Sequence, residues 1–206
     1  MTTPQALVAD EDGTHVYPVR LDGPRIFLRE FEPSDLEESM AIVGDPEVTS
    51  FLSFDTRTRE EQAERLAADI ERARSTPRPD YYLAIVAKET GSLIGFARIG
   101  LIEPTDGEGV RSGELGAAIR KDYWRQGFAT EAAVLMLGFG LDTLGLHRIQ
   151  AACGPDNLAS QAALARLGFQ YEAHLRDHVF TNGAWRDSLL FAILDEEWSA
   201  RAEKQN

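Results

Sequence analysis

The chain has 206 residues, of which 43% are hydrophobic and 27% are charged, a composition typical of one globular domain with a sizeable core. Its apolar runs are too short to cross a bilayer and its N-terminus lacks a signal-peptide pattern, so we expect a cytoplasmic protein without membrane contact. The formal net charge of −13 disfavours nonspecific binding to nucleic acid, which is itself a polyanion. The same charge could attract a cationic amine or simply keep the protein soluble.

The single cysteine, Cys153, excludes an internal disulfide and a CxxC metal site. It lies in an apolar pattern typical of a strand, which favours a small buried residue over a nucleophilic thiol. We therefore expect neither a metal nor a cysteine nucleophile.

The N-terminal region begins with a polar, aperiodic stretch, and residues 1–20 are expected to form an arm outside the domain. Residues 25–29 alternate as a first strand should. A capping-box pattern, Ser34 with Glu37, predicts a helix over residues 34–43.

A second capping box, Thr58 with Glu61, predicts a charged helix reaching about Arg74. Residues 81–88 and 93–100 read as two strands joined by a short turn that contains glycine, which indicates an antiparallel hairpin. An acidic loop over residues 103–109 and a strand over 113–120 follow.

The most informative stretch comes next, where a strand, a tight turn and an apolar helical run succeed one another over residues 113–144. Gly127 and Ala129 stand at the start of the helix, where small residues allow the backbone to approach a ligand closely. Free N–H groups of the first helical turn and the helix dipole favour an anion such as a pyrophosphate there. A tight connection without any ligand is the alternative explanation of this pattern alone.

The C-terminal half continues with a strand over residues 147–153, which follows a helical crossover and is therefore expected to lie parallel to the preceding strand. Asn157 is the expected N-cap of a short helix that ends at Gly168. Two strands, 169–176 and 185–194, complete the chain. We expect a single domain over residues 21–196 and a tail over 197–206.

Two segments together, the turn with its helix and Asn157-Leu158-Ala159-Ser160 some thirty residues later, resemble the GNAT superfamily of acetyl-CoA-dependent N-acyltransferases. The resemblance covers residues 25–194 and is strongest to the ribosomal-protein N-terminal (RimJ/RimL-like) branch. It implies an α/β (α+β) fold with a mixed, mostly antiparallel central sheet, a splayed parallel strand pair and flanking helices. It also makes a homodimer plausible.

The resemblance further implies an acyltransferase that uses acetyl-CoA as cosubstrate, without a metal. The acetyl group would pass to a primary amine, on a protein or peptide N-terminus or a small molecule, by direct attack in a ternary complex. A catalytically silent acyl-CoA-binding regulatory module is the alternative.

Carried over by position, the turn backbone would anchor the pyrophosphate, and the strand before it would pair with the pantetheine arm. Trp124 stands where many members have glutamine or arginine, which puts a direct side-chain contact in doubt. The expected cofactor-binding residues are Ala117, Ala118, Ile119, Trp124, Arg125, Gln126, Gly127, Phe128, Ala129, Thr130 and Asn157.

Glu114 is the candidate general base, although a structural or substrate-orienting carboxylate fits equally well, and Glu131 is a weaker rival. Related enzymes place a tyrosine acid where this chain has Leu164, so Ser160 is the candidate acid, with a second helix cap as its alternative.

The resemblance places the acceptor beside the loop over residues 45–55. Phe51, Phe54 and Asp55 are therefore candidate substrate contacts, with a core role as the alternative for the two phenylalanines.

Overall fold

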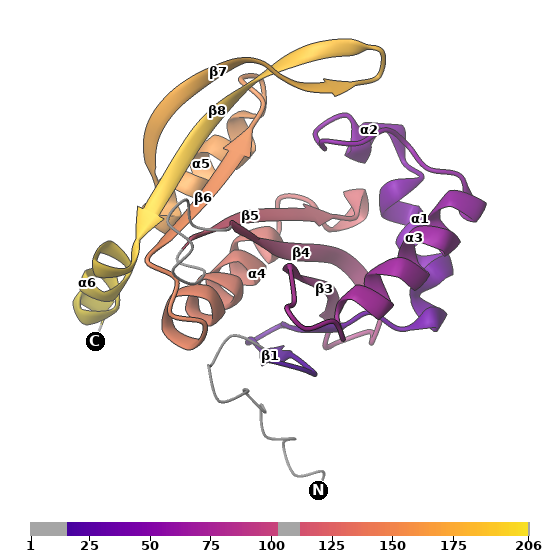
Figure 1. Ribbon diagram of the computed structural model, residues 1–206, viewed down its shortest axis with the longest axis horizontal. Helices are drawn as coiled ribbons and strands as arrows, with labels where there is room; N and C mark the ends of the chain where they lie inside the picture. Colours follow the sequence, from indigo (N-terminus) through magenta and orange to yellow (C-terminus); the bar gives the residue numbers. More distant parts are fainter. Residues whose placement is uncertain (1–15, 103–111, 206) are drawn as a thin grey trace, which may run out of the picture.

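The computed structural model describes residues 16–102 and 112–205 (Figure 1). One eight-stranded sheet has the order β1-β2-β3-β4-β5-β6-β8-β7, and every neighbouring pair is antiparallel except β5 and β6. This arrangement confirms the expected mixed, mostly antiparallel sheet with one parallel pair. The strands are β1 (Arg20–Asp22), β2 (Ile26–Glu30), β3 (Asp80–Ala87), β4 (Leu93–Ile102), β5 (Ser112–Ile119), β6 (Arg148–Cys153), β7 (Gln170–Thr181) and β8 (Ala184–Leu194).

The helices cover both faces of the sheet (Figure 1). They are α1 (Leu36–Val43), α2 (Pro46–Thr49), α3 (Arg59–Arg72), α4 (Phe128–Leu137), α5 (Leu158–Leu167) and α6 (Asp195–Gln205), with 3-10 turns at Pro33–Asp35 and Lys121–Tyr123 and a π-helical segment at Gly138–Thr143. None of them, within the described residues, combines the length and apolar character that crossing a membrane requires.

Alternating side chains on the central strands divide the core into two clusters. Ile99 and Leu115 point toward α4 and α5 and join the main cluster. Phe96 and Ala118 point the other way and join a second cluster with α1, α2 and α3. Because both faces are covered, β3 and β4 are buried along nearly their whole length.

Several local predictions are confirmed. The capping box of Thr58 and Glu61 begins α3, and Asn157 caps α5. Gly168 ends α5 in the left-handed conformation, with φ of 94°. β1 and α2 went unpredicted, and the acidic loop over 103–109 lies outside the described residues.

The N-terminal helix begins differently from the expectation. The capping box of Ser34 and Glu37 does not form, and a box of Glu32 and Asp35, which begins two residues earlier, forms in its place. The Asp35 carboxylate is buried, accepts the Glu32 N–H at 2.8 Å and pairs with both terminal nitrogens of Arg29 at 2.7 and 2.8 Å. A carboxylate with a cationic partner outcompetes a cap that faces solvent.

Both ends of the described chain contribute side chains to the core. Val16 and Val19 fall within the expected N-terminal arm, yet both are 1% exposed and belong to the main core. The expected tail is part of helix α6, whose Trp198 packs against the same core.

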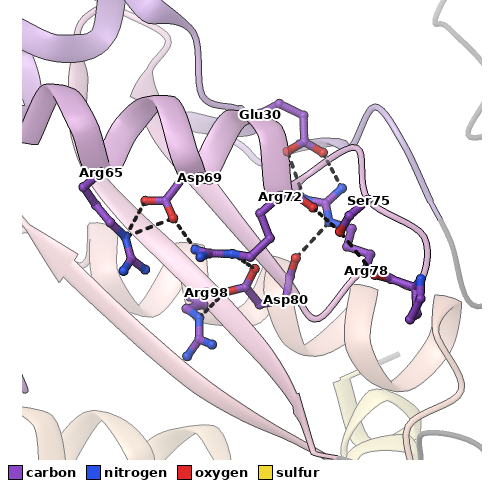
Figure 2. A network of polar contacts seen from close by, with 9 residues as sticks. Glu30, Arg65, Asp69, Arg72, Ser75, Arg78, Asp80 and Arg98 are labelled. Carbon is purple, nitrogen blue, oxygen red and sulfur yellow. Dashed lines mark hydrogen bonds and ion pairs between the residues drawn. The ribbon is translucent and has the colours of Figure 1, made fainter.

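A buried ion pair holds the N-terminal segment to the sheet (Figure 2). Arg78 has a fully buried side chain and binds both carboxylate oxygens of Glu30, at 2.8 and 3.0 Å. The same guanidinium donates to the carbonyls of Val16 and Asp80, at 3.0 and 2.8 Å. Glu30 also accepts the Val19 N–H at 3.0 Å, so one pair joins three segments.

Glu30→Gln is expected to lower the free energy of unfolding by about 3–5 kcal/mol, because it leaves the Arg78 charge buried without its counter-ion. Urea denaturation measures the change. Glu37→Gln is the matched control, since Glu37 pairs with Arg59 on the surface, where ion pairs contribute about 1 kcal/mol or less. Equal losses in the two variants would contradict the assignment.

Candidate functional site

The sheet opens between β5 and β6. The two strands pair only from Ser112 with Arg148 to Glu114 with Gln150. Beyond these residues β5 continues against β4 alone, β6 continues against β8, and the two strands diverge (Figure 1). The edge of β5 that faces the opening therefore presents unpaired backbone groups, within the described part of the chain.

The C-terminal part of β5 combines accessible backbone with anchored side chains. Gly116 and Ala117 are exposed, whereas Ala118 and Ile119 are 7% and 6% exposed and pack in the core. Any ligand along this edge would thus meet main-chain groups and the small side chain of Ala117.

The turn after β5 leads directly into α4. Arg125 and Gly127 take left-handed conformations, with φ of 60° and 84°. Among the described residues, no group accepts a hydrogen bond from the backbone N–H of residues 125–130. Most of these residues are exposed at the positive end of the α4 dipole, which is a setting that binds anions.

Two side chains of this turn support it from within. The Trp124 indole donates to the Ile119 carbonyl at 2.6 Å and packs against both core clusters. Gln126 donates to the Asp122 carbonyl at 3.0 Å. Both residues are predicted cofactor contacts; their side chains fix the turn, and its backbone stays accessible.

A clamp between β2 and α4 completes the turn. Glu131 accepts the N–H groups of Arg25 and Ile26, at 2.7 and 3.2 Å, and pairs with the Arg25 guanidinium at 2.8 Å. Arg25 also donates to the Gln126 carbonyl at 2.8 Å and lies over the Phe128 ring. Burial alone would raise the pKa of Glu131, but the bonds from Arg25 and Ile26 hold it below its usual value. Sequence reasoning missed Arg25, whose partner is 106 residues away.

Glu114 lies where β5 and β6 separate. Its neighbour Leu115 points into the main core, so the Glu114 side chain points to the opposite face, toward α1 and α3. It is exposed, and it has no hydrogen-bond or ion-pair partner in residues 16–102 and 112–205. The carboxylate is therefore available to a ligand.

Ser160 lies at the far end of the opening. Asn157 accepts the Ser160 N–H at 3.0 Å, so Asn157 is the cap and Ser160 is the capped residue. Burial raises the pKa of the Cys153 thiol, and the neighbouring Ser160 side chain opposes that shift. Cys153 lies three residues beyond Gln150 on β6, which separates it from Glu114 by about 10 Å along the strand. Leu164, at the position where related enzymes have a tyrosine acid, is 7% exposed and packs in the main core.

The three candidate acceptor contacts have different surroundings. Phe51 is 49% exposed and meets the edge of Trp124, with ring centroids 6.1 Å apart. Phe54 packs against the second core cluster, as the core alternative predicts. Asp55 accepts the Asn182 N–H at 2.7 Å.

The β7–β8 hairpin reaches across to the loop after α2 (Figure 1). Arg186 donates to the carbonyls of Ser50 and Leu52, the latter at 2.6 Å, and Asp55 binds the hairpin turn at Asn182. The opening is thus bounded by the N-terminal helices and the C-terminal hairpin together. The sequence analysis gave Arg186 no role in the site.

Three comparisons bear on this geometry. A family model described as "Acetyltransferase (GNAT) domain" matches residues 25–170. An uncharacterized N-acetyltransferase, p20 of Bacillus licheniformis, is 30% identical over 85% of this chain and 96% of its own. The [Ribosomal protein uS5]-alanine N-acetyltransferase of Escherichia coli is 34% identical over 41% of this chain and 44% of its own.

Solved structures have the same fold. Mycobacterium smegmatis RimJ in complex with CoA-disulfide superposes with a TM-score of 0.74 over 90% of this chain and 96% of its own, at 23% identity. Among the described residues, no group of three or more His, Cys, Asp or Glu side chains could hold a metal ion.

Glu131→Gln is expected to cost about 1.5–3 kcal/mol of unfolding free energy at pH 7, because Glu131 accepts bonds as a carboxylate. Its folded-state pKa is lowered, so this stabilisation is present above the unfolded pKa and disappears as pH falls through the folded one. Urea titrations from pH 7 to 3.5 should show the gap between wild type and variant closing. Glu64→Gln, on the exposed side of α3, is the control and should give a small, flat difference.

Proposed function

Because the chain belongs to the GNAT acetyltransferase family, we propose that it transfers an acetyl group from acetyl-CoA to a primary amine by direct attack in a ternary complex. The acceptor amine is on a peptide N-terminus or a small molecule. A ribosomal-protein alanine acetyltransferase and a spermidine acetyltransferase among the relatives support this range.

The observation that carries the proposal is the row of unpaired backbone N–H groups over residues 125–130, beside the unpaired edge of β5. These donors suit the pyrophosphate of acetyl-CoA, which carries charge that the α4 dipole favours. The pantetheine arm then lies along β5, where the backbone of residues 117–119 accepts and donates bonds as a neighbouring strand would. Asn157 completes the cofactor contacts from the other side of the opening.

The reaction forms a carbon–nitrogen bond and breaks the carbon–sulfur bond of the thioester. A backbone N–H of β5 polarises the thioester carbonyl, and Glu114 takes the amine proton directly or through a water. The leaving thiolate takes a proton from Ser160 or from a water that Ser160 orients. The amine nitrogen and the leaving sulfur are bonded to the same carbon during the reaction, so the roughly 10 Å between Glu114 and the level of Ser160 along the strands requires at least one of the two proton transfers to pass through a water. Holding both reactants together supplies much of the rate.

Ala129→Glu tests the anchor, because it puts a negative side chain among the proposed pyrophosphate donors. We expect the dissociation constant for CoA, measured by calorimetry, to rise by about tenfold or more through like-charge repulsion. An acidic residue in the first turn of a helix does not disfavour the fold.

Val134→Glu adds the same charge on the exposed side of the same helix and should bind CoA as the wild type does. Equal affinity in the two variants would place the pyrophosphate elsewhere.

Thiol release from acetyl-CoA, measured over N-terminal peptides, polyamines and aminoglycosides, tests the chemistry and names the acceptor class. Glu114→Gln is expected to lower kcat by about 100-fold or more if Glu114 is the base, and Ser160→Ala to lower it less because water can replace the hydroxyl. KM for acetyl-CoA should not change in either variant.

Glu64→Gln and Ser199→Ala are surface controls that should keep full activity. CoA binding without turnover on any acceptor would favour a silent acyl-CoA-binding module. Absence of CoA binding would refute the proposal altogether.

A homodimer remains a prediction from the resemblance, and a cytoplasmic location and the absence of nucleic-acid and membrane partners remain predictions from the sequence pattern and charge. Light scattering of the purified protein tests the first. The net charge of −13 supports the exclusion of nucleic acid.

A further inference from the structure

Arg98 on β4 is fixed by an acidic residue of the neighbouring strand (Figure 2). Its Nε donates to the Asp80 carboxylate at 2.6 Å, and Asp80 also accepts from Arg72 of α3 at 3.1 Å. Asp80 is 4% exposed, so this carboxylate has little freedom to move. The Arg98 side chain is consequently held in one direction.

That direction brings the guanidinium over Gly100. A Cβ built on Gly100 would lie only 2.8–2.9 Å from the guanidinium carbon and its two terminal nitrogens. Gly100 pairs with Asp80 on one side and with Glu114 on the other. Because neighbouring strands are about 4.8 Å apart, the guanidinium lies next to the position of Glu114, on the same face of the sheet.

The two groups are close without being bonded. Within the described residues, the terminal nitrogens of Arg98 have no hydrogen-bond partner, and Arg98 forms no ion pair with Glu114. The Arg98 side chain is 45% exposed, and Glu114 is exposed as well. The Arg98 guanidinium, as a hydrogen-bond donor, and the Glu114 carboxylate, as an acceptor, thus lie next to each other where β5 and β6 separate.

We propose that Arg98 and Glu114 together recognise an α-amino acyl group in the acceptor. The amine nitrogen binds at Glu114, and the carbonyl oxygen of the same residue accepts from the Arg98 fork. Backbone bond lengths put the amine nitrogen and the carbonyl oxygen of one residue about 3 Å apart. Two side chains at neighbouring strand positions can contact both atoms at once. The inference rests on the proposed function and deepens it, because Arg98 here is a specificity-determining residue for the acceptor.

This recognition selects peptide N-termini and amino-acid amides over polyamines. A polyamine offers no oxygen to the guanidinium and brings a second positive charge toward it, which is unfavourable. Arginine suits the role because its planar fork stays charged and loses little freedom on binding.

The test compares alaninamide with sec-butylamine, which carries its amine on a similar branched carbon but lacks the carbonyl. Arg98→Gln is expected to lower kcat/KM for alaninamide by about 10- to 100-fold, the loss of a bond to a charged donor. Turnover of sec-butylamine and KM for acetyl-CoA should stay at wild-type values. For each amine, kcat/KM of the variant is divided by that of the wild type, which cancels the different basicity of the two amines.

Two further variants sharpen the test. Gly100→Ala should reproduce the selective loss, because its Cβ displaces the guanidinium while Arg98 remains present. Arg59→Gln removes the same charge at the opposite end of α3, about 20 Å away along the helix, and should change neither acceptor. Thermal melts check that each variant is folded.

An equal loss for both acceptors in Arg98→Gln, or no loss for either, would overturn the inference. So would a wild type that turns over spermidine and not alaninamide. If the wild type turns over no acceptor, the proposed function fails, and calorimetry of alaninamide with CoA-saturated protein decides the inference separately. Weaker binding in Arg98→Gln than in Arg59→Gln supports it, and equal binding refutes it.

Discussion

The separation of β5 from β6 is the constraint on which the rest of the molecule depends. Three residue pairs join the two strands, after which β5 stays with β4 and β6 stays with β8. An unpaired strand edge inside a sheet is normally unfavourable, because its polar groups lose the partners that a folded backbone requires. Here the edge leads directly into a turn with free N–H groups, so both unpaired features can be satisfied by one extended, anionic ligand.

The side chains around this opening hold the frame, and the backbone is left for the ligand. Trp124 fixes the end of β5, and the clamp of Arg25 and Glu131 fixes the start of α4. Such a division tolerates changes of residue at the turn, since the ligand would contact groups that every residue except proline possesses. It accounts for Trp124 at a position where many members of the family have glutamine or arginine.

Local patterns predicted most of the fold, because the signals for caps, hairpins and crossovers lie within a few residues of one another. β1, with 3 residues, and α2, with 4, are too short to produce a periodic pattern. The sequence could not reveal contacts between distant segments. It was Arg29, on another element, that moved the first capping box to Asp35.

The site followed the same rule. The sequence predicted the turn backbone, Glu114 and Asn157 as site residues, whereas the contacts of Arg25 and Arg186 and the position of the Arg98 guanidinium depend on pairings between distant segments. The different burial of Phe51 and Phe54, three residues apart, likewise depends on which of them meets α3 and the sheet.

The hairpin contact with the loop after α2 has a consequence for how the protein is made. The bonds from Arg186 and Asn182 join residues separated by 127 to 136 positions, nearly two thirds of the chain. Contacts of such sequence separation form late, because closing a long loop costs entropy before any contact repays it. During synthesis the turn and α4 leave the ribosome well before β8 does, so an emerging chain carries the turn without the wall that bounds the opening. The enzyme therefore becomes complete only when almost the whole chain has been synthesised, and truncation within β8 would remove that wall while leaving the turn intact.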